Sequence, residues 1–284
     1  MKIFQWVLPS LALLFSAGFV SGASSVQNAV IALGPWDSAQ PELVGVLSGK
    51  KWLEQQDAAK MVKGGETFKL YSNAGMSGSA KGSKPESLGV PCEETSSVKL
   101  KPSRKPKTFE IGVTGTWNAR PRAVTVLPND SAPYVKIASE FLANKGLENP
   151  NVQLKNVLKV DLDNDKTDEV FLVGRQFQQS GMGDLFPPVD LRAGDYAFLL
   201  MRKIVNGKVV TISLGDDVIL KDNSPESDIQ HLASLYDIAG ILDLNGDGKL
   251  ELVTYGAYYE GYNFEILEWT GKKFVSRAVS GCGA

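Results

Sequence analysis

The sequence predicts a mainly β protein with a smaller α+β N-terminal region. From residue 151 onwards, short apolar runs alternate with turn residues, which is typical of antiparallel strands. A rhythm of four such runs occurs twice, over residues 151–216 and 232–282, and each copy carries an acidic loop between its first and second runs. We therefore expect two four-stranded antiparallel units in this half of the chain.

The first residues have the pattern of an export signal. Lys2 precedes an apolar run over residues 7–20, and Ser21 and Ala23 are the small residues of a cleavage site. We expect cleavage after Ala23, so that residues 1–23 are a signal peptide and the protein is secreted or periplasmic. The run is shorter than the roughly 20 apolar residues that span a bilayer, and we expect no transmembrane segment in the mature chain. A buried N-terminal helix is the alternative interpretation.

The charge balance gives no indication of a polyanionic partner. Lys and Arg total 30 against 32 Asp and Glu, a formal net charge of −2. Binding to nucleic acid or to an anionic membrane is therefore not expected.

Two cysteines, Cys92 and Cys282, are candidates for a single disulfide in an exported chain. The bond would join the N-terminal region to the C-terminus. A zinc or thiol-catalysis site fits poorly, because the two cysteines are far apart in sequence and the chain has only one His.

The N-terminal region, residues 24–108, has weak periodicity. Its expected elements are strands over 28–33 and 66–72 and a helix over 52–62. A stretch rich in Gly, Ser and Lys over 73–89 predicts a mobile loop. Basic residues over 97–108 surround two prolines without aromatic residues, which indicates a solvated linker rather than a polyanion-binding strip.

Residues 109–150 join short strands to one helix. Ser131 is among its candidate N-caps, Pro133 lies in the first turn, and Gly146 closes the helix. Its apolar residues recur at helical spacing on one face, so we expect this helix to pack on the core.

The two repeats supply the remaining strands. The dipeptide Asn206-Gly207 between two apolar runs predicts a tight hairpin. The expected strands are 152–162, 169–176, 196–204 and 208–214 in the first repeat, and 236–242, 251–258, 262–269 and 274–279 in the second.

The two acidic loops align without a gap over nine positions and predict two calcium sites. Ca²⁺ takes six to eight oxygen ligands, and a loop that curls round one ion presents alternate side chains inward. We expect side-chain ligands at positions 1, 3, 5 and 9 and a main-chain carbonyl at position 7. The predicted ligands are Asp161, Asp163, Asp165, Thr167 and Glu169 in the first loop, and Asp243, Asn245, Asp247, Lys249 and Glu251 in the second.

The loops differ from each other and from an EF-hand. Position 6 needs a left-handed bend, which Gly248 adopts freely and Lys166 only at a cost of roughly 1 kcal/mol. An EF-hand needs a Glu at position 12, where these loops have Leu172 and Thr254. The first loop has one more carboxylate among its expected ligands, Asp163 in place of Asn245, so either loop is a candidate for the tighter site; we favour the second. Acidic surface turns without metal are the alternative.

The pattern Asp-x-[Asp/Asn]-x-Asp-Gly-x-x-[Asp/Glu] leading into a strand resembles the calcium loop of FG-GAP and VCBS-type repeats, over about residues 152–282. The resemblance implies four-stranded blades, arranged like a β-propeller or packed as a sandwich, with calcium in the loop between the first two strands. Lys166 departs from the family's Gly. The whole chain also resembles a family of exported bacterial proteins, which implies no function.

Three classes of function follow. The first is a calcium-stabilised, non-catalytic binding or adhesion module for a protein or carbohydrate ligand. The aromatic run Tyr255, Tyr258, Tyr259 and Tyr262 is a candidate surface, although strand alternation places half of it in the core. The second is a secreted hydrolase with a calcium-stabilised β scaffold, for which glycans are one substrate class. Its active loop would be residues 178–195, and His231 is the only histidine. The third is a structural partner in an envelope assembly.

Overall fold

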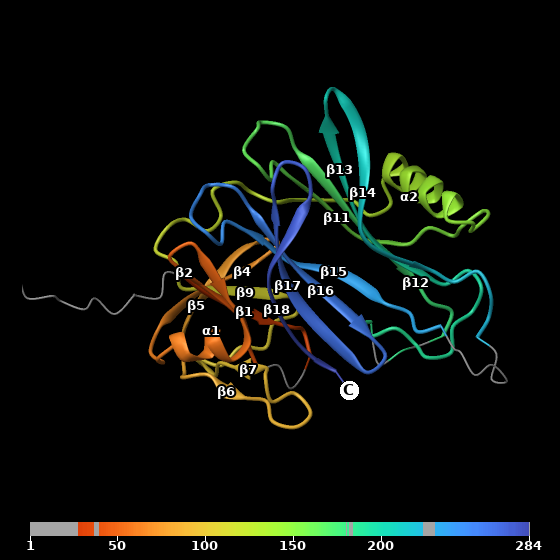
Figure 1. Ribbon diagram of the computed structural model, residues 1–284. Coiled ribbons are helices and arrows are strands. Elements are labelled where there is room, and N and C mark those ends of the chain that lie inside the picture. Colours follow the sequence, from red (N-terminus) through yellow and green to blue (C-terminus); the bar gives the residue numbers. More distant parts are fainter. Residues whose placement is uncertain (1–27, 37–39, 180, 182–183, 224–230, 284) are drawn as a thin grey trace, which may run out of the picture.

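Three antiparallel sheets make up the computed structural model, which describes residues 28–36, 40–179, 181, 184–223 and 231–283 (Figure 1). The predicted signal peptide and its cleavage site lie outside the described residues. The expectation of a mainly β protein is confirmed. None of the helices among the described residues combines the length and the apolar composition that a membrane crossing requires.

The first sheet is built around β1 (Asn28–Leu33), whose six residues are all buried. Alternate side chains of β1 enter two different clusters: Ala29, Ile31 and Leu33 lie in one, and Val30 and Ala32 in the other. A strand that is covered on both faces reads as a continuous apolar run, which the sequence shows here. The other strands of this sheet are β2 (Glu42–Ser48), β3 (Lys51–Leu53), β4 (Thr67–Ser72), β5 (Gly75–Gly82), β6 (Glu86–Ser87), β7 (Ser96–Ser97), β8 (Leu100–Lys101) and β9 (Glu110–Val113).

One sequence-based expectation for this region holds with shorter bounds, and another is wrong. The helix predicted over 52–62 is shorter, α1 (Gln55–Met61), because residues Lys51–Leu53 pair with β2 as β3. The stretch predicted as a mobile loop contains β5, which pairs with β4 along most of its length. Glycine fits this strand because the neighbours are close: a Cβ at Gly82 would lie 2.5 Å from the Phe68 ring.

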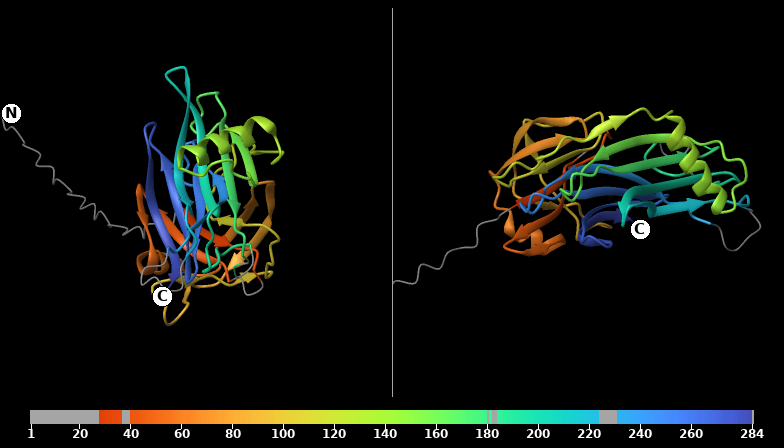
Figure 2. Two further views of the ribbon diagram at one scale, coloured as in Figure 1. Left: turned by 90° about the vertical axis from the view of Figure 1, so that its right-hand side faces the viewer. Right: turned by 90° about the horizontal axis from the view of Figure 1, so that it is seen from above.

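The second sheet is a meander with one added edge strand. Its strands are β10 (Thr125–Leu127), β11 (Leu154–Val160), β12 (Glu169–Gln176), β13 (Tyr196–Val205) and β14 (Lys208–Val218). The turn between the last two has positive φ at Asn206 and Gly207, as the predicted tight hairpin requires. Helix α2 (Ala132–Asn144) covers one face, where Ala138 and Leu142 are buried against β12 and β13 (Figures 1 and 2). Residues 109–150, which the sequence sets apart as one segment, therefore contribute to two sheets: β9 belongs to the first sheet and β10 to the second.

The third sheet has strands β15 (Leu235–Leu242), β16 (Glu251–Tyr258), β17 (Gly261–Trp269) and β18 (Phe274–Gly283), paired in sequence order. It lies between the other two sheets. Val253 and Tyr255 of β16 enter a cluster with β1 and β9, whereas Leu252 faces a cluster with β11, β12 and β13. Both faces of this sheet are therefore buried, and Tyr255 of the aromatic run is a core residue.

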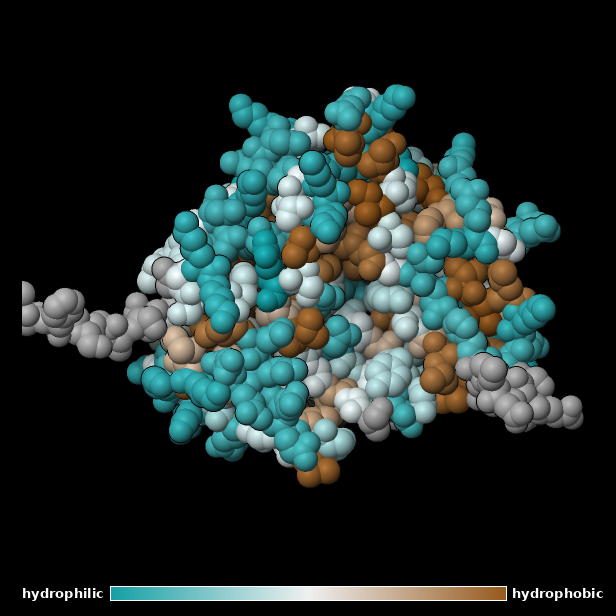
Figure 3. Space-filling view, in the orientation of Figure 1, coloured by the Kyte–Doolittle hydropathy of each residue, from teal (hydrophilic) through white to brown (hydrophobic). Residues whose placement is uncertain are grey.

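The surface is mostly polar on the face shown in Figure 3, where hydrophobic residues lie in small groups among hydrophilic ones. Cys92 and Cys282 form a disulfide that ties the loop after β6 to the end of β18. The Thr95 hydroxyl donates to the Gly281 carbonyl beside this bond.

Removal of the disulfide is expected to destabilise the protein. The bond closes a chain segment of 190 residues, so Cys92→Ser/Cys282→Ser should lose about 2–5 kcal/mol of unfolding free energy in urea titration. Reduction of the wild-type protein should give the same midpoint as the double variant. Equal midpoints for oxidised wild-type protein and the double variant would contradict the prediction.

Candidate metal centre

The two acidic loops have the same backbone conformation. Loop 1 (residues 161–169) joins β11 to β12, and loop 2 (residues 243–251) joins β15 to β16. At position 6, φ is +70° at Lys166 and +81° at Gly248, so the predicted left-handed bend is present in both. A second left-handed residue, which sequence reasoning missed, occupies position 4: φ is +62° at Asn164 and +80° at Gly246.

Three carboxylates at equivalent positions hold each loop by accepting backbone N–H groups. Position 1 accepts from position 6, position 5 from position 7, and position 9 from position 2. The distances in loop 1 are 3.1 Å for Lys166 N to Asp161 Oδ2, 2.8 Å for Thr167 N to Asp165 Oδ1 and 2.8 Å for Leu162 N to Glu169 Oε2. The distances in loop 2 are 3.0 Å for Gly248 N to Asp243 Oδ2, 2.8 Å for Lys249 N to Asp247 Oδ1 and 2.6 Å for Leu244 N to Glu251 Oε2. The same pattern of carboxylate-to-backbone bonds therefore holds both loops, whereas among the described residues only loop 1 brings three carboxylates within 4.8 Å of one another.

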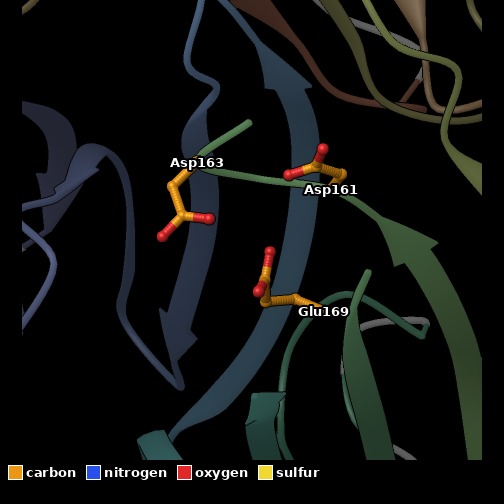
Figure 4. A group of neighbouring side chains, drawn as sticks. All are labelled: Asp161, Asp163 and Glu169. Atoms are coloured by element: carbon orange, nitrogen blue, oxygen red, sulfur yellow. The ribbon is translucent and has the colours of Figure 1, made fainter. Parts of the chain in front are cut away.

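A buried lysine from the neighbouring strand β13, which sequence reasoning missed, contacts the carboxylates of loop 1. Oxygen atoms of Asp161, Asp163 and Glu169 lie within 4.8 Å of one another, a grouping that could hold a metal ion (Figure 4). The Lys203 Nζ from β13 lies 2.6 Å from Glu169 Oε1, 3.0 Å from Asp163 Oδ2 and 3.4 Å from Asp165 Oδ2. Lys203 is 7% exposed and Glu169 is fully buried. An ammonium group thus already contacts the carboxylates that were expected to bind calcium.

The charges of loop 1 stabilise one another. Burial opposes ionisation of Lys203, but hydrogen bonds and attraction from Glu169 and Asp163 hold its pKa above the ordinary value. Burial raises the pKa of Glu169, and the hydrogen bond from Lys203 opposes that rise. Asp165 is more exposed; burial acts upward there too, but the Thr167 N–H and Lys203 bring its pKa below the ordinary value. The ammonium group of Lys203 on β13 therefore compensates the negative charge of loop 1.

In the third sheet, the strand register places Glu268 at the position that Lys203 occupies in the second sheet. Val170 of β12 pairs with Arg202, so the preceding Glu169 lies beside Lys203. Leu252 of β16 pairs with Leu267, so the preceding Glu251 lies beside Glu268. Loop 2 therefore has a carboxylate where loop 1 has an ammonium group.

The carboxylates of loop 2 lack a cationic partner among the described residues. Glu251 is fully buried and Asp243 is 3% exposed, and no described Lys, Arg or His forms an ion pair with either or with Asp247. Glu251 Oε1 instead accepts from the neutral Asn245 amide at 3.0 Å. Burial, followed by repulsion from Asp247, Asp243 and Glu268, raises the pKa of Glu251 to about 9. Burial also raises the pKa of Asp243, against its backbone hydrogen bonds.

The donor set of loop 2 suits a hard divalent cation. The side chains of Asp243, Asn245, Asp247 and Glu251 offer oxygen atoms only from carboxylates and one amide, which Ca²⁺ prefers. A cation would compensate the charge of the buried Asp243 and the charge that Glu251 gains when it loses its proton. The ligand roles of the Thr167 and Lys249 carbonyls stay predictions.

Two side chains from the segment between β9 and β10 position both loops, and neither was foreseen. Trp117 Nε1 donates to the Asp243 carbonyl at 2.9 Å. The Arg122 guanidinium donates to carbonyls of both loops, at Asp161 (2.5 Å) and at Gly248 (2.8 Å). No local pattern in the sequence links these residues to the loops, because more than a hundred residues separate Trp117 and Arg122 from loop 2.

The other candidate residues have structural contacts. Asp195 is fully buried and accepts the backbone N–H groups of Gln178 and Arg192, so it holds the ends of the proposed active loop together. His231 Nε2 lies 2.7 Å from Asp217 Oδ1 at an exposed position. Tyr262 donates its hydroxyl to the buried Glu42 carboxylate at 2.9 Å.

No family model, no curated protein and no solved structure matches this chain.

Removal of the Lys203 ammonium group should destabilise the protein strongly. Lys203→Met leaves the buried Glu169 carboxylate without its charged partner, so we expect a loss of about 3–5 kcal/mol of unfolding free energy in urea titration. Lys208→Met, at an exposed position of the same hairpin, is the matched control and should change stability by less than about 0.5 kcal/mol. Equal effects of the two substitutions would show that Lys203 does not neutralise loop 1.

Proposed function

We propose that this chain is an exported, non-catalytic binding module that loop 2 stabilises by binding one Ca²⁺ ion. The observation that carries the proposal is the buried Glu251 beside Glu268, where the equivalent Glu169 lies beside Lys203. The two loops thus share a backbone conformation, but Lys203 compensates the charge of loop 1, whereas loop 2 has no cation beside its glutamate among the described residues.

The proposal reduces the number of expected calcium sites from two to one. A divalent ion in loop 1 would have to displace Lys203 Nζ from contacts of 2.6 and 3.0 Å with Glu169 and Asp163. Loop 2 presents no such competitor among its described neighbours. We therefore assign calcium to Asp243, Asn245, Asp247 and Glu251, with loop 1 as a metal-independent copy of the same loop.

Membership in the FG-GAP and VCBS-type repeats is part of the proposal. Support comes from the position of each loop between the first and second long strands of an antiparallel sheet and from the face-to-face packing of the second and third sheets. The second sheet departs from a four-stranded blade through its added strand β10. The first sheet has short strands in a different order and has no loop of this kind among its described residues.

A binding role agrees with the way in which the site is built. The loop side chains hold the backbone through N–H bonds, and the adjacent strands pass directly into the core. A metal ion at such a point fixes the relative position of two strands and a loop, which produces a rigid surface. Calcium outside cells fills even sites with dissociation constants near 10⁻⁴–10⁻³ M. We propose a protein or carbohydrate ligand for this surface.

Calcium should stabilise the protein through loop 2. At about a hundred times the dissociation constant, the ion adds roughly 2.7 kcal/mol of unfolding free energy, which a thermal melt records as a higher midpoint. Asp243→Asn should abolish this rise, whereas Asp161→Asn, the equivalent change in loop 1, should keep it. Magnesium should give a smaller rise because it retains its water ligands. A rise lost in Asp161→Asn and kept in Asp243→Asn would contradict the assignment.

Stability without calcium should fall as the pH rises. The folded protein raises the pKa of Glu251 from the ordinary 4.5 to about 9, so between these values the folded state binds a proton that the unfolded state has released. The unfolding free energy therefore decreases with pH across this window. Calcium displaces the proton, so the calcium-induced rise in the melting midpoint should be larger at pH 8 than at pH 6.

Glu251→Gln is the control for this pH dependence. The amide has no proton to release, so the variant should lose both the fall in stability with pH and the response to calcium. A wild-type protein whose calcium response is the same at both pH values would contradict the role of Glu251.

A further inference from the structure

A cleft of about 600 Å³ opens beside loop 2. One wall is acidic and comes from the third sheet: Asn245 and Asp247 of the loop and Glu268 of β17. The opposite side comes from the first sheet, where Lys50, Lys51 and Trp52 lie at the turn between β2 and β3 and in β3. The cleft therefore lies where two sheets meet, and its size is that of a small-molecule site.

The acidic wall is part of the proposed metal site. Asn245 and Asp247 line the cleft, whereas their partners Asp243 and Glu251 are buried behind them. A cation held by the four side chains would thus border the cleft. Ca²⁺ takes six to eight oxygen atoms, so positions that the loop does not fill are available to water or to a ligand.

The opposite side carries positive charge, which the carboxylate of Asp57 near Lys51 offsets in part. Lys50 and Lys51 are exposed, and no described carboxylate forms an ion pair with either. Arg277 also lines the cleft, but its Nε lies 2.8 Å from Glu268 Oε2, so these two charges offset each other. With calcium in loop 2, the net charge around the cleft is positive, which favours an anionic ligand.

Trp52 adds an apolar surface to this charged cleft. The side chain is half-buried and packs against the core cluster between the first and third sheets, so the ring is held in place. A fixed aromatic face beside charged groups suits the flat apolar face of a sugar ring whose edge carries a carboxylate. A peptide carboxylate shares the charge but lacks the ring.

We propose that this cleft binds an acidic oligosaccharide, a chain of sugars bearing uronic-acid carboxylates. One carboxylate binds between the loop 2 cation and the ammonium groups of Lys50 and Lys51, and a sugar ring lies against Trp52. The inference rests on the proposed calcium site and names the ligand class that this site would serve.

The experiment is isothermal titration calorimetry of the purified protein with trigalacturonate as the probe, in calcium and in chelator. Galactotriose tests the need for the carboxylate, and a hexa-aspartate peptide tests the need for the sugar. Lys50→Gln/Lys51→Gln removes the two ammonium charges at exposed positions of the cleft. Lys272→Gln/Lys273→Gln removes the same charge at another exposed turn outside the cleft and serves as the matched control.

We expect trigalacturonate to bind in calcium only, about tenfold more weakly in the Lys50/Lys51 variant, and unchanged in the control variant. Binding that persists in chelator, that is equal for galactotriose, or that is stronger for the peptide would overturn the inference. The melting midpoint separates the two proposals. If calcium raises the midpoint but no saccharide binds, the ligand assignment fails and the calcium site stands; if calcium leaves the midpoint unchanged, both fail.

Discussion

The burial of one glutamate at the end of each acidic loop is the constraint on which the functional half of this protein depends. Glu169 and Glu251 are fully buried, and each accepts the backbone N–H of loop position 2. This bond closes the loop at the point where the next strand enters the core. An ionised carboxylate in such a place is costly unless a cation compensates it. Each loop therefore closes either with a cation beside the glutamate or with the glutamate protonated.

Strand register decides whether a neighbouring strand supplies that cation. In the second sheet, the strand beside Glu169 offers Lys203, and in the third sheet the strand beside Glu251 offers Glu268. Register is set by the buried faces of both sheets, since a slip of one residue would turn the apolar side chains of β12 or β16 away from their clusters. The hydrophobic packing between sheets thus determines the electrostatics of the loops.

Much of the fold and of the loop chemistry could be predicted because both are local. The alternation of apolar residues indicated the strands. Gly248 indicated a left-handed residue at position 6, and the gapless alignment of the loops assigned the same conformation to Lys166. Lys203 could not be predicted, because its contact with Glu169 spans 34 residues and depends on register. The roles of Trp117 and Arg122 are of the same non-local kind. The Gly- and Ser-rich composition of residues 75–82 predicted a loop, but these residues form β5, where neighbouring side chains leave no room for a Cβ at Gly82.

Compensation of a loop by a lysine, as in loop 1, differs in its consequences from compensation by an external cation, as we propose for loop 2. A lysine on a neighbouring strand is always present, so loop 1 closes whenever the chain folds. An external cation is conditional on its concentration and on pH, so the calcium that we propose for loop 2 would link the packing of the third sheet to the surroundings. A lysine also fills the space between the carboxylates, whereas a metal ion retains coordination positions of its own. With the proposed cation, the loop without the lysine would both stabilise the fold and contact a ligand, and it is the loop that borders the cleft.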